Sequence, residues 1–199
     1  MKHTRCNPGA ALAAATLLLA TLGGCRALPA LHYYALEAAS PVSAPIATSG
    51  ALLIHVRHVG LPREMDHLGL THHIGPTQLV ISDQDQWTVP LNVLIQGTIT
   101  RDLGARLGFE HVVATDALPV VRGSAQSTLD FDFVTLSADG SCGITAQVNW
   151  TWSVPNGAAR AGSVQLAVPA SGCPAGLPAA LSTALGQLTD QLLAPLSAP

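Results

Sequence analysis

The chain has 199 residues, of which 48% are hydrophobic and only 11% are charged, and its formal net charge is −3. A mildly acidic chain without a basic run has no electrostatic basis for binding nucleic acid or an anionic membrane surface. After residues 1–24 no apolar run approaches the roughly 18 residues needed to cross a bilayer. The remaining length suits one domain with a buried core.

The N-terminus has the three parts of an export signal. Lys2 and Arg5 precede an apolar segment over residues 10–22, and small residues follow that segment. The segment is too short to be a permanent transmembrane anchor and is typical of a cleaved signal peptide. Its end, Leu22-Gly23-Gly24-Cys25, resembles the bacterial lipobox, in which the peptidase cuts before the cysteine and the cysteine carries the lipid.

We therefore predict a lipoprotein signal peptide over residues 1–24, lipid attachment at Cys25, a tether over residues 25–32 and one domain over residues 33–196. An ordinary secretory signal with an incidental cysteine is the alternative. One acyl chain binds a membrane only marginally, and the three chains typical of bacterial lipoproteins would hold the protein durably.

Cys142 and Cys173 are the cysteines outside the predicted signal and lipid site. An exported protein folds in an oxidising compartment, so we predict a disulfide between them, with two buried free thiols as the alternative. Residues 155–160 have the composition of a hairpin turn. If Val154 faces Ala161 across that turn, the two cysteines also face each other on paired strands. A two-residue Asn-Gly turn would offset them.

Alternating apolar patterns predict short strands over residues 31–36, 51–59, 77–81, 111–114 with 119–121, 128–136, 143–152 and 162–168. The clearest is 128–136, where Leu129, Phe131 and Phe133 share one face and Asp130 and Asp132 the other. Residues 63–76 are expected to form an irregular loop, and residues 82–85 a polar turn.

Two helices are predicted from leucine-rich stripes with three- and four-residue spacing. The first begins with Thr88 as its cap and ends at Gly108, and the second runs from about Pro174 or Pro178 to Leu193. The order of these elements favours an α+β fold, in which two amphipathic helices pack on one face of a mostly antiparallel sheet in a single domain.

Five of the eight histidines lie between residues 55 and 73. On the strand over 51–59, His55 shares a face with Arg57, and His58 is expected on the opposite face, so His55 and His58 do not form an obvious chelating pair. Because no Cys or Glu stands at ligand spacing and no nucleophile motif is present, we predict no metal, no cofactor and no enzymatic activity.

Four short motifs follow one another through the first half of the chain: Tyr33-Tyr34-Ala35-Leu36, Val59-Gly60-Leu61-Pro62, Met65-Asp66 and Trp87-Thr88-Val89-Pro90-Leu91. Together with the lipobox, their order and spacing resemble the ABC-type transport auxiliary lipoproteins, typified by paraquat-inducible protein C. The resemblance is strongest from residue 33 to residue 107. The chain departs from the family in residues 67–73, where an Arg-Pro-Gln-type run is usual, and at Gln86, where the family favours Arg.

The resemblance implies a non-enzymatic component of a lipid-transport system built from an ABC transporter and a periplasmic MCE (mammalian cell entry) domain protein. The lipoprotein would dock the MCE protein at the inner leaflet of the outer membrane and so support membrane integrity. Arg26 favours the outer membrane, because it is not the Asp that retains lipoproteins in the inner membrane of enteric bacteria. Homo-oligomerisation stays open.

The segment that departs from the family is the candidate partner contact, through Asp66, His67, His72 and His73. His72 and His73 are expected in a loop, within reach of His67. Such a group suits a pH-sensitive contact or a metal site, and exposed polar surface is the alternative. Two other functions remain for the whole chain: an outer-membrane structural or assembly lipoprotein, and a periplasmic His-rich metal binder.

Overall fold

A five-stranded sheet forms the centre of the domain, in the strand order β5 (Val112–Ala114), β2 (Leu53–Gly60), β6 (Gln126–Ala138), β7 (Ile144–Ser153) and β8 (Arg160–Val168). Neighbours from β6 to β8 pair antiparallel, whereas β2 pairs parallel with both β5 and β6. This computed structural model describes residues 29–39, 53–114, 126–155 and 157–197. Cys25 and residues 119–121 lie outside the described residues.

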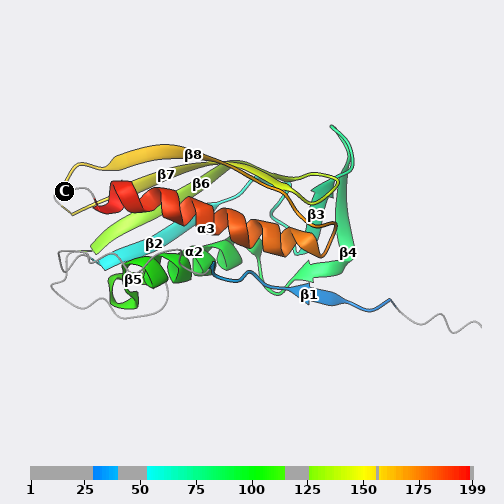
Figure 1. Cartoon of the computed structure of the whole chain (residues 1–199), viewed down its shortest axis with the longest axis horizontal. Coiled ribbons are helices and arrows are strands. Elements are labelled where there is room, and N and C mark those ends of the chain that lie inside the picture. The colour runs from blue at the N-terminus through cyan, green and yellow to red at the C-terminus, as the bar shows by residue number, and fades with distance from the viewer. Residues whose placement is uncertain (1–28, 40–52, 115–125, 156, 198–199) are drawn as a thin grey trace, which may run out of the picture. The chain divides into compact units, whose positions relative to one another are not determined.

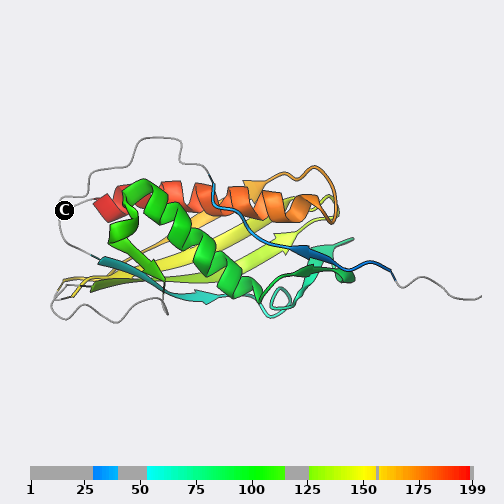
Figure 2. The same cartoon turned by 90° about the horizontal axis from the view of Figure 1, so that it is seen from below.

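Both long helices pack on the same face of this sheet (Figures 1 and 2), α2 (Leu91–Leu107) against β2 and β5 and α3 (Gly176–Ser197) against β8 and β7. The predicted leucine stripes are buried, and their fully or almost fully buried members are Leu91, Ile95, Ile99, Leu103, Leu107, Leu177, Leu181, Leu185, Leu188 and Leu192. The strand face of Leu129, Phe131 and Phe133 meets them from the sheet side. The predicted α+β domain is confirmed, with mixed rather than purely antiparallel sheets.

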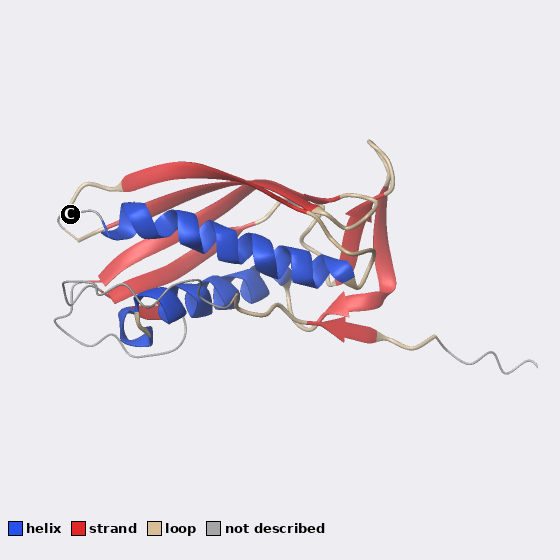
Figure 3. Cartoon of the chain, in the orientation of Figure 1, coloured by secondary structure: helices blue, strands red, loops and turns tan. Residues whose placement is uncertain are grey.

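A second, three-stranded sheet stands at the end of the domain where α3 begins (Figure 3), with the order β1 (His32–Tyr34), β4 (Leu79–Trp87), β3 (Gly69–His73). β1 pairs parallel with β4, and β3 pairs antiparallel with it. The prediction of an irregular loop over residues 63–76 was therefore wrong in its second half, because pairing with β4 extends residues that have no strand pattern of their own.

β4 also runs through the predicted polar turn over residues 82–85. The register with β3 moves from Thr71 opposite Ile81 to Gly69 opposite Gln86, so the intervening residues of β4 bulge out of the ladder. The Ser82 hydroxyl accepts hydrogen bonds from the backbone N–H groups of residues 84 and 85 inside the bulge. The polar residues thus make a local turn within a strand instead of ending it.

A bulge in β2 overturns the predicted placement of His58. The register with β6 shifts between Val56 and His58, and Val56 and Val59 are both buried although they are three residues apart. The phase of the strand is reset at Arg57, which places His58 on the solvent side with His55. Gln96 on α2 stabilises the bulge, because its Nε2 donates to the Val56 carbonyl at 2.8 Å.

The start of α2 differs from the predicted cap. The helix follows Pro90 without a side-chain cap, and the Thr88 N–H donates to the Tyr34 carbonyl at 2.9 Å. Thr88 thus serves the junction between β1 and β4 instead of the helix. At the other end Gly108 terminates α2 as predicted, with φ at 97°, a value that favours glycine. A 3-10 turn, η1 (Phe109–His111), leads from there to β5.

Cys142 and Cys173 form a disulfide, with 5.1 Å between their Cα atoms, but not in the predicted register. The β7–β8 ladder pairs Thr151, not Val154, with Ala161, so the cysteines do not face each other across paired strands. Both stand in loops beyond the strand ends, one before β7 and the other before α3. Their pairing therefore depends on where two loops meet at the same end of the sheet.

Residues 35–39 lie across α2 and α3 and are held by polar groups from both. Arg101 on α2 donates to the Leu36 carbonyl at 3.0 Å, and the Glu37 N–H donates to the Ser182 hydroxyl of α3 at 3.1 Å. Leu36 itself is buried in the core. We call residues 35–39 the strap, because they connect β1 to the two helices.

A buried charge cluster lies beneath the strap. Arg106 of α2 donates through Nε to Asp190 of α3 at 2.6 Å, and its other nitrogens donate to the carbonyls of Asp102 and Gly186. The Asp102 carboxylate is fully buried, lies 3.7 Å from the Arg106 guanidinium, and accepts no hydrogen bond that meets standard geometry. Burial raises the pKa of Asp102 to about 6, against the opposing charge of Arg106 and the nearby Ala39 N–H.

Two glycines in the long helices test how closely the strap packs. A Cβ on Gly186 would lie 2.5 Å from the Ala39 Cβ, whereas a Cβ on Gly97 would meet nothing within 4 Å. We expect Gly97→Ala to raise the free energy of unfolding by up to about 1 kcal/mol through helix propensity. Gly186→Ala should lower it by roughly 1–3 kcal/mol, because the added methyl displaces the strap. Urea denaturation followed by circular dichroism measures both, and equal gains would show that the strap is loosely held.

Asp102→Asn should raise the free energy of unfolding at neutral pH. The pKa of the carboxyl has its ordinary value of 3.8 in the unfolded chain and is about 6 in the folded one. Between these two pH values Asp102 is protonated in the folded protein but ionised in the unfolded one. The free energy of unfolding therefore falls as the pH rises from about 4 to about 6, and it stays at the lower value above that range. The raised pKa corresponds to about 3 kcal/mol, as an order of magnitude. Urea denaturation of both proteins from pH 4 to pH 8 should show a gain that grows with pH, and a constant difference would contradict the assignment.

Candidate partner-binding end of the domain

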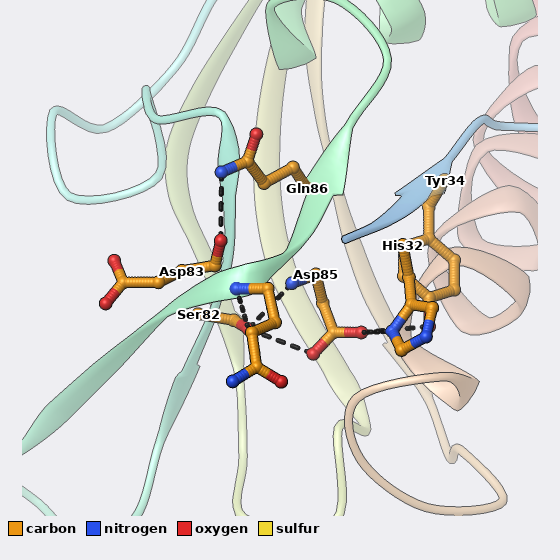
Figure 4. A network of polar contacts seen from close by, with 7 residues as sticks. His32, Tyr34, Ser82, Asp83, Asp85 and Gln86 are labelled. Carbon is orange, nitrogen blue, oxygen red and sulfur yellow. Dashed lines mark hydrogen bonds and ion pairs between the residues drawn. The ribbon is translucent and has the colours of Figure 1, made fainter. Parts of the chain in front are cut away.

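The small sheet and the preceding loop over residues 61–68 form the surface that we call the small-sheet end. Its polar centre is the carboxylate of Asp85 (Figure 4). His32 Nδ1 lies 3.1 Å from Asp85 Oδ1, the Tyr34 hydroxyl donates to the same oxygen at 3.2 Å, and the Ser82 hydroxyl donates to Oδ2 at 2.9 Å. One carboxylate thus connects β1 to β4 by side chains as well as by the backbone ladder.

The electrostatics of this cluster favour the ionised carboxylate. Burial acts to raise the pKa of Asp85, but the hydrogen bonds from Ser82, His32 and Tyr34 outweigh it, and the pKa is lowered. For Tyr34, burial and then the hydrogen bond to Asp85 raise the pKa of the phenol. At neutral pH the cluster therefore holds an aspartate anion and a neutral tyrosine, the arrangement that closes β1 onto β4.

The loop before β3 exposes two of the predicted contact residues. Met65 is buried in the core, and its N–H donates to the Pro62 carbonyl at 2.9 Å, which makes a tight turn. Because Met65 anchors the turn, the next residues, Asp66 and His67, are left exposed. The hydrophobic-Asp motif thus has a physical explanation: one residue fastens the loop and the other faces outward.

The two remaining predicted contact residues lie on β3 and are half-buried. His73 pairs with Leu79 and His72 with Val80 in the hairpin with β4. His67 is not a member of the group of ligating side chains that includes His72. Within the described ranges, the group of three metal-ligating side chains that come together joins His72 to Cys142 and Cys173.

Exposed apolar side chains also gather on this end, and the sequence patterns did not single them out. They are Leu31, Tyr33, Leu68, Ile74 and Ile81. Gln86 pairs with Tyr33 on one side and with Gly69 on the other, so these three positions share one face of the small sheet. A Cβ on Gly69 would lie 2.8 Å from the Ile81 side chain, which places Ile81 on the same outer face as Tyr33. Alternation in β1 would have separated Tyr33 from Tyr34, but only the sheet shows which one faces outward.

Other polar and aromatic side chains have their partners elsewhere in the domain. Arg57 donates two hydrogen bonds to Asp130, at 2.9 and 2.6 Å, on the solvent face of the large sheet. Trp150 and Trp152 are buried in the core, and a Cβ on Gly162 would lie 2.7 Å from the Trp150 ring. None of these residues lies at the small-sheet end.

A family model matches the chain over residues 34–193, and its description is "ABC-type transport auxiliary lipoprotein component". The chain belongs to the ABC-type transport auxiliary lipoprotein family. The family assignment confirms the resemblance stated from the four motifs. In the structure of this family member, those motifs fasten the two sheets and the helices together: Leu36, Val59, Met65, Trp87 and Leu91 are all buried.

Solved structures show the same fold. One, described as an uncharacterised protein, aligns with a TM-score of 0.63 and 16% identity over 84% of this chain and 99% of its own. Another, from Xanthomonas campestris and assigned to the family model DUF330, aligns with a TM-score of 0.60 and 17% identity over 84% of this chain and 94% of its own. No curated protein matches the sequence. In the part of the chain that is described, no helix is long and apolar enough to cross a membrane.

Asp85→Ala should loosen β1 from β4 while the core remains folded. The substitution removes the acceptor of His32, Tyr34 and Ser82, and a hydrogen bond to a charged group contributes about 1.5–3 kcal/mol. We expect amide hydrogen exchange in residues 32–34 to become at least roughly tenfold faster at neutral pH. Asp83→Ala, at an exposed neighbouring position, is the control.

The same contact should weaken in acid in the unchanged protein. The pKa of Asp85 is lowered in the folded protein, so its carboxylate stabilises the fold at every pH above the ordinary aspartate pKa. This stabilisation is lost as the pH falls through the lowered pKa. After correction for intrinsic rates, exchange in β1 should therefore accelerate on acidification in the wild type but not in Asp85→Ala. Identical profiles would show that the carboxylate does not hold β1.

Proposed function

We propose that this auxiliary lipoprotein is a non-enzymatic component of an ABC/MCE-type lipid-transport system, which docks the periplasmic MCE protein at the outer membrane. The family match over residues 34–193 is the observation that supports it most, since it assigns the chain to transport systems. The finer parts, namely the MCE partner, lipid as cargo and the outer membrane, are our inference from the lipobox, Arg26 and the resemblance.

The covalent path from the lipid supports docking at a membrane surface. β1 begins at His32, seven residues after Cys25, which allows at most about 25 Å of extended chain. β1 is itself part of the small-sheet end, where it is clamped to β4 through Asp85. A lipid on Cys25 would therefore keep the small-sheet end within this distance of the membrane.

The composition of the small-sheet end suits a protein partner. Exposed apolar residues such as Tyr33 and Ile81 stand beside the exposed polar residues Asp66 and His67. Apolar side chains bordered by polar ones are the usual composition of a binding surface. The loop is fastened by Met65 and the sheet by Asp85, so the surface is held in place before a partner binds.

Cys25→Ser should release the protein from the membrane and abolish its contribution to detergent resistance, because the lipid is its only proposed attachment.

Asp66→Ala combined with His67→Ala should leave the protein at the membrane but reduce copurification of the MCE protein of the same organism by tenfold or more, since both side chains belong to the proposed contact. Fractionation, affinity purification and a detergent-sensitivity assay measure the three effects.

Glu110→Ala is the matched control, since Glu110 is also exposed but lies beside β5, at the opposite end of the large sheet from the small-sheet end (Figure 1). It should change neither localisation nor copurification. If the wild-type protein brings down no MCE protein or ABC transporter, the proposed role fails. Copurification with an outer-membrane assembly machine or peptidoglycan would then support the structural alternative. Metal bound to the isolated protein while its disulfide is intact would support the third.

A further inference from the structure

A histidine from the small sheet meets the disulfide of the large sheet. His72 on β3, Cys142 before β7 and Cys173 before α3 place their ligand atoms within 4.8 Å of one another. Cys142 is fully buried, and His72 Nδ1 is buried without a hydrogen-bond partner. A buried ring nitrogen of this kind loses its hydrogen bond to water and gains none in return, which is unfavourable unless something else engages it.

We propose that His72, Cys142 and Cys173 form a binding site for a thiophilic metal ion, which is closed while the disulfide is intact and becomes available when a dithiol reduces it. The proposal goes beyond the docking function and does not depend on it. A dithiol reductant transfers two electrons and two protons to the Cys142–Cys173 bond, giving two thiols and a cyclic disulfide on the reductant. Binding of the ion then displaces the two thiol protons.

The donor set determines the class of metal. Two thiolates and one imidazole are ligands for Zn²⁺ or Cu⁺, not for Mg²⁺ or Ca²⁺, which prefer oxygen. Zinc binds thiolate sulfur at about 2.3 Å and imidazole nitrogen at about 2.0 Å, so in a tetrahedral site two thiolates and one imidazole lie roughly 3.5–3.8 Å apart. The observed grouping allows these separations once the sulfur atoms part, and the Cα atoms are already 5.1 Å apart.

Two of the three ligands, Cys142 and His72, stand on segments that are held independently of the disulfide. The turn with Cys142 is organised by Asp139, whose carboxylate accepts from the N–H and hydroxyl of Ser141 and from the Gly143 N–H at 2.6–3.0 Å. His72 is held by its pairing with Val80 in the β3–β4 hairpin. These contacts do not involve sulfur, so reduction leaves the segments in place to receive an ion.

The consequence of metal binding differs from that of the disulfide. The disulfide joins two loops of the large sheet and leaves β3 out, whereas the ion would bond to β3 as well. Metal binding would therefore couple the small-sheet end to the core, and β3 should open less often. Amide exchange over residues 69–73 reports this coupling directly.

The test uses the full chain with Cys6 and Cys25 replaced by serine, so that no other thiol competes. The protein is reduced with a phosphine, freed of reductant under nitrogen, and titrated with Zn²⁺ against a chromophoric chelator and with Co²⁺ by absorption spectroscopy. We expect one equivalent of each ion to bind to the reduced protein, a thiolate-to-cobalt charge-transfer band, and slower exchange in residues 69–73. The oxidised protein should show none of these.

Three variants decide the ligand assignment. Cys142→Ser with Cys173→Ser should abolish binding and the charge-transfer band. His72→Gln should weaken Zn²⁺ binding by more than roughly tenfold, because it removes a direct ligand and the loss of an outer-shell partner alone costs about that much. His67→Gln, at the exposed histidine on the preceding loop, should bind as the parent does. Equal binding to reduced and oxidised protein, or to His72→Gln and the parent, would overturn the proposal. A reduced chain that loses its sheet signal in circular dichroism and does not regain it with Zn²⁺ would also overturn it.

Discussion

Burial of two leucine stripes against one face of a five-stranded sheet is the interaction on which the rest of the structure depends. The apolar stripes from Leu91 to Leu107 on α2 and from Leu177 to Leu192 on α3 pack on the inner face of this sheet, α2 over β2 and β5 and α3 over β8 and β7. Each buried leucine contributes roughly 1.5–3 kcal/mol. The opposite face of the sheet is left to solvent, and its charges pair there, as Arg57 does with Asp130. Few polar side chains are buried in this core, and Asp102 and Arg106 are among them.

Two sets of polar contacts connect the N-terminal segment to this core. The Asp85 cluster clamps β1 onto β4, and the strap then passes over α2 and α3, where Arg101 and Ser182 hold its backbone. Asp102 lies buried beneath it and costs stability at neutral pH, since its burial outweighs the attraction of Arg106. The segment that would lead to a lipid is thus bonded to the small sheet and to both long helices, so a pull on it would be transmitted to the core.

The small-sheet end is the part of the domain where core and surface requirements meet. Buried family-motif residues such as Met65 and Trp87 hold it to the core, while the residues that depart from the family pattern, His67 among them, lie exposed on its loop. This division explains how a family can retain its fold and vary its contacts. His72 belongs to neither group, because it departs from the pattern and yet points toward the disulfide.

The sequence by itself determined which residues are buried in the two long helices and in β6. The stripes of α2 and α3, the alternation of β6 and the end of α2 at Gly108 follow from period and propensity, which are local properties. The two cysteines could be paired by composition and compartment, and the motifs identified the family. The lipid site at Cys25 remains a prediction from sequence.

Only the tertiary structure decided how the elements pair. The parallel pairing of β2 with β5 and β6, the strand at β3, and the bulge that turns His58 outward depend on partners far along the chain, such as Gln96 beneath the bulge. A strand pattern shows which face is apolar but not which neighbour supplies the ladder, and one extra residue reverses every later side chain. For the same reason the meeting of His72 with the disulfide could not be read from spacing: the three residues come from segments that only the packed sheets bring together.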